Sequence, residues 1–239
     1  MKCPYLSDVH IEREASLVLS GYEKKYGEIS GFATPIEEII ENYLRYTLEM
    51  RPLQDADILG FINLGKKLIV VNSILDPQEN SAVSNNGRAR YTMGHECGHE
   101  ILHGYMYHER ISSPLLWEEN NSEQILCRSS NKKPRVEWQA DYFSAAVLMP
   151  KRKMIACWKI ITGADAPLYV KKIDASMRIG HIVLPDSYDV VVVDNVNVPL
   201  YDFVTSFAEN FEVSRQAVSI RLKQLNLLRE DATLELLPA

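Results

Sequence analysis

The chain has 239 residues, of which 46% are hydrophobic and 24% are charged, and its formal net charge is −6. This is an ordinary globular composition, with enough residues for one sizeable core and a small second domain. The negative charge argues against a protein whose whole surface binds nucleic acid, so any DNA contact must be local.

The sequence indicates neither a signal peptide nor a membrane-spanning helix. The N-terminal residues contain no apolar stretch of signal-peptide length, and no later run approaches the length of a membrane span. The four cysteines, at positions 3, 97, 127 and 157, are scattered without a Cys-x-x-Cys pair, which favours reduced thiols. We therefore expect a cytoplasmic protein with no membrane partner.

Two helices are predicted near the N-terminus. Apolar residues recur at helical spacing between Val9 and Tyr26, and Gly27 follows as the C-cap. The second helix opens at Thr34-Pro35, with Thr34 as its N-cap. The two predicted buried stripes are Ile11, Ala15, Val18, Leu19 and Tyr22 in the first helix, and Ile36, Ile39, Ile40, Tyr43 and Leu44 in the second.

A β-hairpin and a surface loop are predicted next. Two short runs rich in β-branched residues, 58–63 and 67–72, are separated by a turn at 64–66. Polar residues, glycine and proline at 76–87 predict a loop, after which a helix begins near Arg88. Helices followed by a hairpin and another helix predict an α+β fold.

The helix after this loop carries His-Glu-x-x-His, at positions 95–99. On an α-helix His95 and His99 share one face and lie about 6 Å apart along the axis, so both imidazoles can bind one metal ion. Glu96 stands beside such an ion, where its carboxylate can take a proton from a metal-bound water. By composition alone the motif arises in about one such chain in a hundred, so a second group of residues must support it.

His103 lies one further turn along the same helix. On a straight helix it is about 12 Å along the axis from His95, too far for both to join His99 on one ion. We favour an indirect or structural role for His103 over ligation. The connection from Gly104 to Pro134 is long and mostly polar, and we interpret it as irregular surface, although a role in covering the substrate stays open.

A second helix that carries candidate functional residues is predicted at 136–149, ending before Pro150. Its apolar setting contains Glu137 and Asp141, one turn apart on the same face, and buried carboxylates need a partner or a cation. Zinc with two histidines lacks one protein ligand of its usual catalytic set, and Glu137 would supply it. Asp141 would accept the second N–H of a ligating histidine. The alternative is that both acids face solvent.

The stretches 90–99 and 137–150 together resemble the ImmA/IrrE family of metallopeptidases, in order and in spacing. The resemblance implies a gluzincin-like zinc site with His95, His99 and Glu137 as ligands and Glu96 as the base. It also implies a protein substrate, a repressor-like regulator. The sequence differs from many members by Asp141 in place of Asn and by Cys97 in place of an apolar residue, and neither change removes a ligand.

The C-terminal part is less clearly interpreted. Segments 179–184 and 189–194 resemble strands, and His181 in the first is interpreted as structural. Two short amphipathic helices at 201–212 and 215–225, with Ser214 as an N-cap, predict a helix-turn-helix-like segment. Four basic residues make it locally positive: Arg215, Arg221, Lys223 and Arg229. We favour packing or partner recognition over DNA binding.

The sequence thus predicts three parts: a zinc metallopeptidase domain at 1–162, an insertion at 163–199 and the helix-turn-helix-like segment at 200–239. The predicted function is that of a zinc-dependent endopeptidase acting on a protein. Manganese or iron would accept the same ligands. Two alternatives from other classes stay open: a DNA-binding regulator with a structural metal site, and a partner-binding regulator, such as an antitoxin, with a latent site.

Overall fold

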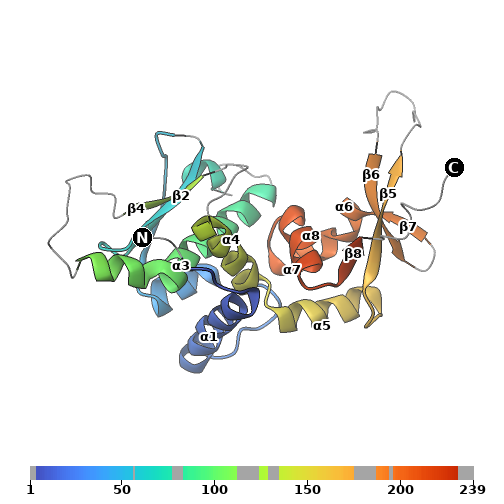
Figure 1. Cartoon of the computed structure of the whole chain (residues 1–239), viewed down its shortest axis with the longest axis horizontal. Helices are drawn as coiled ribbons and strands as arrows, with labels where there is room; N and C mark the ends of the chain where they lie inside the picture. Colours follow the sequence, from blue (N-terminus) through green and yellow to red (C-terminus); the bar gives the residue numbers. More distant parts are fainter. Residues whose placement is uncertain are drawn as a thin grey trace. The chain divides into compact units, whose positions relative to one another are not determined.

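The structure is a computed structural model of the whole chain, and it describes residues 4–55, 57–76, 83–111, 124–128, 135–174, 187–193 and 196–230. The chain divides into two compact units (Figure 1). Unit 1 contains Met1–Pro150 and Phe211–Val213, and unit 2 contains Lys151–Asn210 and Ser214–Ala239. The predicted boundaries at 162 and 199 stay a prediction.

Unit 1 combines helices with one small sheet, which confirms the α+β class. Its helices are α1 (Asp8–Tyr26), α2 (Ile36–Glu38), the π-helix η1 (Ile39–Tyr43), the 3-10 helix η2 (Ser73–Leu75), α3 (Val83–Ile111) and α4 (Arg135–Leu148). Its strands are β1 (Thr47–Arg51), β2 (Ile58–Asn63), β3 (Leu68–Asn72) and β4 (Gln124–Arg128).

Helix α1 forms where the sequence places it. The Ser7 hydroxyl accepts a hydrogen bond from the backbone N–H of His10, and Gly27 closes the helix with a φ of 100°. That angle lies in the region that glycine adopts without strain. The five residues of the predicted stripe, from Ile11 to Tyr22, are all buried, so this prediction is confirmed.

The second helix differs from its prediction in two ways. Only α2 is α-helical, and η1 continues it as a π-helix. Thr34 is not the N-cap, because its hydroxyl donates instead to the carbonyl of Val147 at 2.9 Å. The N-cap prediction is therefore wrong, and the hydroxyl holds the C-terminal end of α4. Of the predicted stripe, Ile36, Ile39 and Ile40 are buried, while Tyr43 and Leu44 are half-buried.

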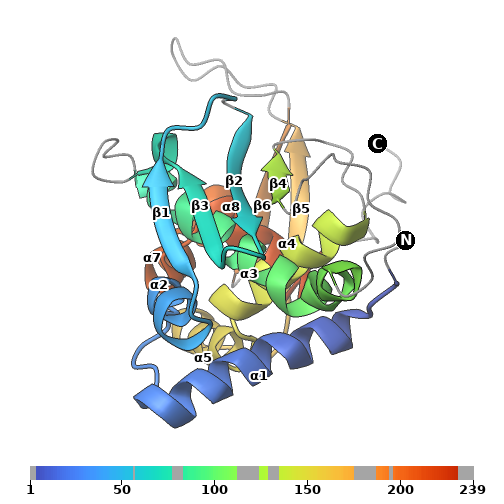
Figure 2. The ribbon, with the colours of Figure 1, turned by 90° about the vertical axis from the view of Figure 1, so that its left-hand side faces the viewer.

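The sheet of unit 1 has the strand order β1-β3-β2-β4 (Figure 2). Strands β2 and β3 pair antiparallel, with Gly60 opposite Val71, so the predicted hairpin is confirmed. Strand β1 pairs with β3 in parallel and β4 pairs with β2 antiparallel, and neither edge strand was predicted. The interpretation of 104–134 as irregular surface is thus wrong at 124–128, and also at 104–111, which belong to α3.

Helix α3 is longer than predicted at both ends. It begins at Val83 rather than near Arg88, and it continues through Gly104 to Ile111. Glycine is tolerated inside a helix at a cost of about 1 kcal/mol relative to alanine, so Gly104 alone does not end it. Residues 77–82 of the predicted loop lie outside the described residues.

Small residues let α3 and α4 approach closely. A Cβ atom at Gly98 would lie 3.0 Å from Cα of Ala140, and one at Gly94 would lie 2.6 Å from Oγ of Ser144. Two glycines one turn apart on α3 therefore face an alanine and a serine one turn apart on α4. The Ser144 hydroxyl also donates to the carbonyl of Tyr91 at 2.8 Å. This close crossing brings the side chains of α4 to the histidine face of α3.

Unit 2 is built around a second sheet, of order β7-β6-β5-β8. Its strands are β5 (Leu168–Asp174), β6 (Ser187–Val193), β7 (Val196–Pro199) and β8 (Leu228–Glu230), and its helices are α5 (Lys151–Thr162), α6 (Leu200–Phe203), α7 (Thr205–Phe211) and α8 (Arg215–Gln224). Strand β8 pairs in parallel with β5, so residues after α8 join the sheet that precedes α6. The predicted strand at 179–184, with His181, lies outside the described residues.

Ser214 begins α8, because its hydroxyl accepts a hydrogen bond from the backbone N–H of Ala217 at 3.1 Å. That cap prediction is confirmed, whereas the helix predicted at 201–212 is divided into α6 and α7. The helix-turn-helix character of this segment stays a prediction. In the described part of the chain, none of the helices combines the length and the apolarity needed to cross a membrane.

Candidate metal centre

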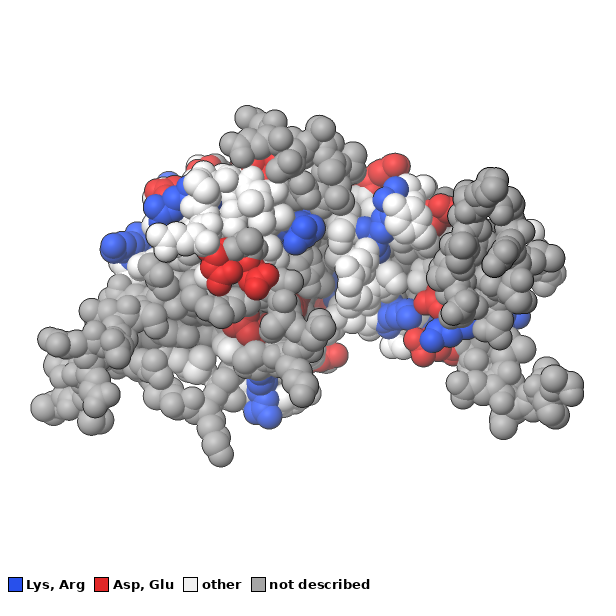
Figure 3. All heavy atoms as spheres, turned by 90° about the horizontal axis from the view of Figure 1, so that it is seen from above, with Lys and Arg blue, Asp and Glu red and all other residues white. Residues whose placement is uncertain are grey.

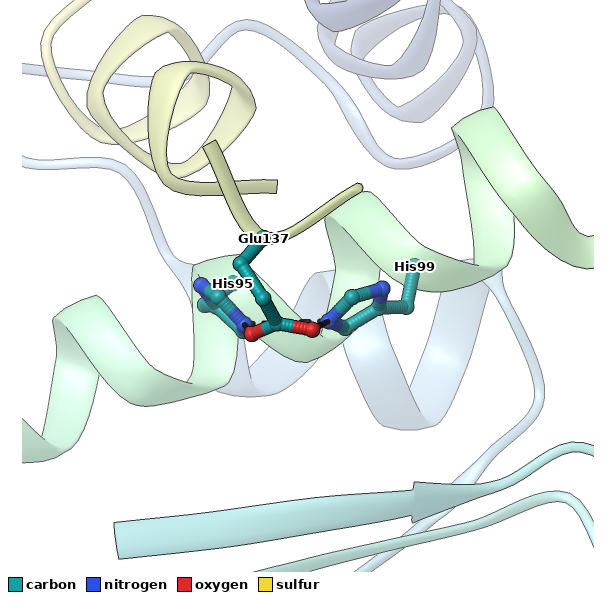
Figure 4. A group of neighbouring side chains, drawn as sticks. All are labelled: His95, His99 and Glu137. Atoms are coloured by element: carbon teal, nitrogen blue, oxygen red, sulfur yellow. Dashed lines mark hydrogen bonds and ion pairs between the residues drawn. The ribbon is translucent and has the colours of Figure 1, made fainter. Parts of the chain in front are cut away.

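Helix α3 brings two imidazoles together in its interior-facing surface. His95 and His99 are one turn apart, and their side chains are fully buried. The Nε2 atoms of the two rings lie 3.0 Å from each other (Figure 4). Both rings therefore line the same small volume, as the spacing of the motif predicts.

Helix α4 adds a carboxylate to this volume. Oε2 of Glu137 lies 3.2 Å from Nε2 of His95, and Oε1 lies 3.5 Å from Nε2 of His99. Figure 4 shows the Glu137 carboxylate between the two rings. The side chain of Glu137 is 15% exposed, so solvent reaches the group from one side. The close crossing at Gly98 is what gives Glu137 this reach.

These three side chains fit a divalent cation. One ligand atom from each of His95, His99 and Glu137 lies within 4.8 Å of the other two. Ligand bonds of about 2.0–2.2 Å in a tetrahedral zinc site put the ligand atoms roughly 3.3–3.6 Å apart, close to the separations found between these atoms. Two imidazole nitrogens and one carboxylate are also the donor types that zinc takes in catalytic sites. In the described part of the chain, this is the group with metal-ligand geometry.

The second ring nitrogen of His95 is directed at Asp141. Nδ1 of His95 lies 2.9 Å from Oδ1 of Asp141. An ionised carboxylate only accepts hydrogen bonds, so Nδ1 carries the proton and donates. In a neutral imidazole, Nε2 then presents its lone pair to the cluster. The Tyr91 hydroxyl donates to the carbonyl of Asp141 at 2.9 Å, which adds a further tie between α3 and this turn of α4.

His103 lies on the far side of His99 from the cluster. Its Nδ1 is 3.2 Å from Nδ1 of His99, and its Nε2 is 2.8 Å from Oε1 of Gln139. Gln139 is fully buried on α4 and was not recognised from the sequence. The available signal was a polar residue within an otherwise small and apolar helix face. His103 therefore contacts the candidate ligand His99 from the side away from the cluster. It lies one turn further along, because α3 continues as a helix through both residues.

Glu96 is fully buried and differs from its neighbours in having no hydrogen-bond donor near either carboxylate oxygen, within the described part of the chain. Burial, together with the nearby charge of Glu137, raises the pKa of Glu96 to about 8, although His95 opposes this. Oε1 of Glu96 lies against β2, 3.5 Å from the position that a Cβ atom at Gly60 would take. A buried carboxylate without a donor is costly unless a ligand or cation compensates it.

Burial and neighbouring side chains shift the pKa values of the groups in and beside the cluster. Burial raises the pKa of Glu137, but the neighbouring imidazoles of His95 and His99 outweigh this effect and hold the pKa well below its usual range. Burial lowers the pKa of His99, and the neighbouring His95 lowers it further. Burial also lowers the pKa of His103 to about 4. These directions favour an ionised Glu137 and a neutral His99, which are the protonation states that bind a metal.

The structure thus brings four of the five predicted site residues into direct contact: His95, His99, Glu137 and Asp141. The fifth, Glu96, lies in the same buried region. A family model described as Peptidase M78, IrrE N-terminal-like domain, matches residues 43–162, which is half of the chain. The match spans both helices of the cluster. No curated protein matches the chain.

Proposed function

Because the chain belongs to the ImmA/IrrE family, whose matching domain is that of Peptidase M78, we propose that it is a zinc-dependent endopeptidase with a gluzincin-like site. The family suggests a metallopeptidase. The finer assignment, to zinc and to particular catalytic residues, rests on the geometry of the cluster. His95, His99 and Glu137 would be the protein ligands, and Glu96 would be the general base.

The convergence of three electron-pair donors is the observation that carries this proposal. Nε2 of His95, Nε2 of His99 and the carboxylate of Glu137 lie within 4.8 Å of one another. Since Asp141 takes the other N–H of His95, these atoms face one another mainly as acceptors. Such an arrangement is stable when a cation or shared protons occupy its centre.

The chain's own residues would then divide the work of peptide hydrolysis. A bound zinc ion would polarise the peptide carbonyl and lower the pKa of the attacking water toward neutrality. The charge of that ion would favour the ionised form of Glu96, which would accept the proton of the water on a carboxylate oxygen and pass it to the nitrogen of the leaving amine. Its burial without a competing donor supports this role. Asp141 would hold the imidazole of His95 through Nδ1.

The family resemblance supports a repressor-like regulatory protein as the substrate. The proposal is an endopeptidase that cuts such a protein at an internal peptide bond.

Replacing Glu96 by Gln tests the mechanism. We expect Glu96→Gln to retain one zinc per chain and to lose cleavage by at least about 10²-fold, since general-base catalysis contributes roughly 10²–10⁴-fold. The zinc-loaded full chain is incubated with a proteome-derived peptide library, and new N-termini are labelled and identified by mass spectrometry. Zinc content is measured by elemental analysis of the same samples.

A matched variant separates loss of chemistry from loss of metal. His99→Ala removes a ligand, so it should lose both zinc and cleavage, whereas Glu96→Gln should lose cleavage alone. Glu96→Gln cleaving as fast as the wild-type chain would contradict the proposed base. Wild-type protein that binds no zinc would contradict the metal site itself.

The DNA-binding alternative has less support from the contacts of α8. Arg215 donates from Nε to the hydroxyl of Thr205 at 2.8 Å and from Nη1 to the hydroxyl of Tyr201 at 2.7 Å. Arg221 is fully buried, and Nζ of Lys223 lies 3.1 Å from a carboxylate oxygen of Glu230. Two of the four predicted basic residues therefore have partners within unit 2, and a third is buried. We propose that this segment serves the fold or a protein partner.

A further inference from the structure

A chain of buried hydrogen bonds leads away from the metal cluster and ends on a backbone carbonyl. The side-chain Nε2 of Gln139 donates to the carbonyl oxygen of Pro4 at 2.9 Å. Oε1 of Gln139 lies 2.8 Å from Nε2 of His103, and Nδ1 of His103 lies 3.2 Å from Nδ1 of His99. Gln139, His103 and His99 are each at most 1% exposed, so water does not replace these partners from bulk solvent.

The position of each proton along this series of hydrogen bonds follows from the Pro4 carbonyl, where the series ends. A backbone carbonyl only accepts hydrogen bonds, so the amide nitrogen of Gln139 points to Pro4 and its oxygen points to His103. That oxygen also only accepts, so Nε2 of His103 carries a proton. In a neutral imidazole Nδ1 of His103 is then an acceptor, and Nδ1 of His99 must be the donor between the two rings.

The tautomer of His99 decides whether it can bind a metal in the cluster. With its proton on Nδ1, His99 presents the lone pair of Nε2 toward Glu137, at 3.5 Å. The other neutral tautomer would point an N–H at the same place and could not coordinate. Asp141 fixes His95 from its Nδ1 side, whereas Nδ1 of His99 faces the imidazole of His103.

We propose that Gln139 and His103 form a hydrogen-bond relay, anchored on the Pro4 carbonyl, that holds His99 in its metal-binding tautomer. Both are positioning residues that act through His99. The inference rests on the proposed metal site and assigns a role to a histidine that the motif spacing excludes as a ligand. It also gives the N-terminal segment at Pro4 a function in the metal centre, although Pro4 lies 91 positions before His95 in the sequence.

The first measurement requires no substitution. Long-range ¹H–¹⁵N correlation spectra of the zinc-loaded, histidine-labelled full chain report which ring nitrogens of His99 and His103 carry protons. We expect protonated Nδ1 and unprotonated Nε2 in His99, and protonated Nε2 and unprotonated Nδ1 in His103. A His103 ring protonated on Nδ1 would overturn the relay, whether or not any variant folds.

The second measurement compares zinc affinity by competition with a chromophoric chelator. Gln139→Leu removes the acceptor for His103, and we expect the affinity to fall about 10–100-fold, as for other partners that orient metal ligands. Gln139→Glu keeps an acceptor oxygen toward His103 but loses the donor to the Pro4 carbonyl, so its affinity should fall less than that of Gln139→Leu. Ser144→Ala is the matched control, since it removes a buried hydrogen bond between α4 and α3 outside the relay and should leave the affinity unchanged.

The outcomes distinguish this relay from the proposed function. Wild-type chain that binds zinc, with Gln139→Leu binding it equally tightly, would overturn the relay and leave the metal site intact. If Gln139→Glu is as weak as Gln139→Leu, the acceptor is not what matters and the relay is also overturned. If the zinc affinities of the variants change as the relay predicts but the wild-type chain does not cleave the peptide library, the proposed peptidase activity is overturned and the relay is supported.

Discussion

At the scale of single residues, Tyr46 shows how a buried polar group supports the helix that carries the site. Its hydroxyl donates to Oε2 of Glu100 on α3 at 2.6 Å, and the residue is 4% exposed. Burial, strengthened by the hydrogen bond to Glu100, raises the pKa of Tyr46 well above its usual value. An ionised phenolate here would be both desolvated and repelled by the carboxylate.

This pKa predicts a loss of stability at alkaline pH. The folded chain keeps the proton of Tyr46 at pH values where the unfolded chain has released it, so the stabilisation is complete below about pH 10. Above that pH the free energy of unfolding falls by about 1.4 kcal/mol per pH unit for this group. Tyr46→Phe should be less stable at pH 7, by about 1–3 kcal/mol for the lost hydrogen bond.

Denaturant unfolding of the wild-type chain and Tyr46→Phe between pH 7 and pH 11 checks this prediction. The stability difference should stay constant up to about pH 10 and then shrink, because the variant lacks the titrating phenol. A difference that stays the same up to pH 11 would show that Tyr46 does not titrate with folding. Zinc affinity at pH 7 serves as the control and should not change, because the Tyr46 hydroxyl donates to Glu100, which lies outside the cluster.

At the scale of elements, the crossing of α3 and α4 determines the geometry of the metal centre. The histidines come from α3 and the carboxylates from α4, so a small shift between these helices moves Glu137 away from both rings. The two atoms nearest to a Cβ at position 98 belong to the backbone of Ala140, including its carbonyl oxygen at 3.1 Å, and the third is Cβ of Phe143. Backbone atoms cannot turn aside as a flexible side chain can.

Gly98→Ala should therefore weaken metal binding more than it weakens the fold. Added volume in a packed interface costs about 1–3 kcal/mol, while alanine in a helix interior gains about 1 kcal/mol over glycine. We expect a net loss of roughly 0–2 kcal/mol in the free energy of unfolding and a clear loss of zinc affinity. Chelator competition and denaturant unfolding measure the two effects separately.

Gly94→Ala combined with Ser144→Ala is the control for this prediction. The atom closest to a Cβ at Gly94 is the Ser144 hydroxyl, at 2.6 Å, and the second substitution removes it. The double variant should bind zinc more tightly than Gly98→Ala. If both variants lose the same amount of zinc affinity, any methyl group added to this interface disturbs the site. The backbone contact at Ala140 would then not be the cause.

At the scale of the whole molecule, Figure 3 shows both basic and acidic side chains on the described residues of each unit. Basic and acidic side chains are interspersed there, in keeping with a net charge of −6. Within unit 2, the guanidinium of Arg215 also lies 4.3 Å from the ring centroid of Tyr201. Such contacts hold a basic side chain against its neighbours within unit 2.

We therefore expect no sequence-specific DNA binding by the full, zinc-loaded chain. Selection from a random duplex pool at about 150 mM salt should enrich no sequence, and residual binding should weaken steeply as salt increases. Arg215→Ala should lower the thermal stability of the chain, because it removes two hydrogen bonds and the contact with Tyr201. Enrichment of one sequence, lost in Arg215→Ala without loss of stability, would favour the DNA-binding alternative.

The sequence by itself determined features that depend on near neighbours in the chain. The α1 stripe, the β2–β3 hairpin and the Ser214 cap follow from local periodicity and turn chemistry, and the structure has all three. The spacing of His95 and His99 likewise follows from one helical turn. The pairing of that motif with Glu137 and Asp141 could be proposed because a metal site with two histidines needs a third ligand and an orienting acceptor.

Tertiary structure decided what depends on residues far apart in the chain. Strands β1 and β4 have weak local signals and are stable because β3 and β2 supply their hydrogen bonds. Thr34 has the sequence of an N-cap, yet its hydroxyl binds a carbonyl at position 147. The same holds for Gln139, whose partners are His103 and Pro4. Hydrogen-bond donors and acceptors in a core are matched by packing, and packing is not visible in local sequence.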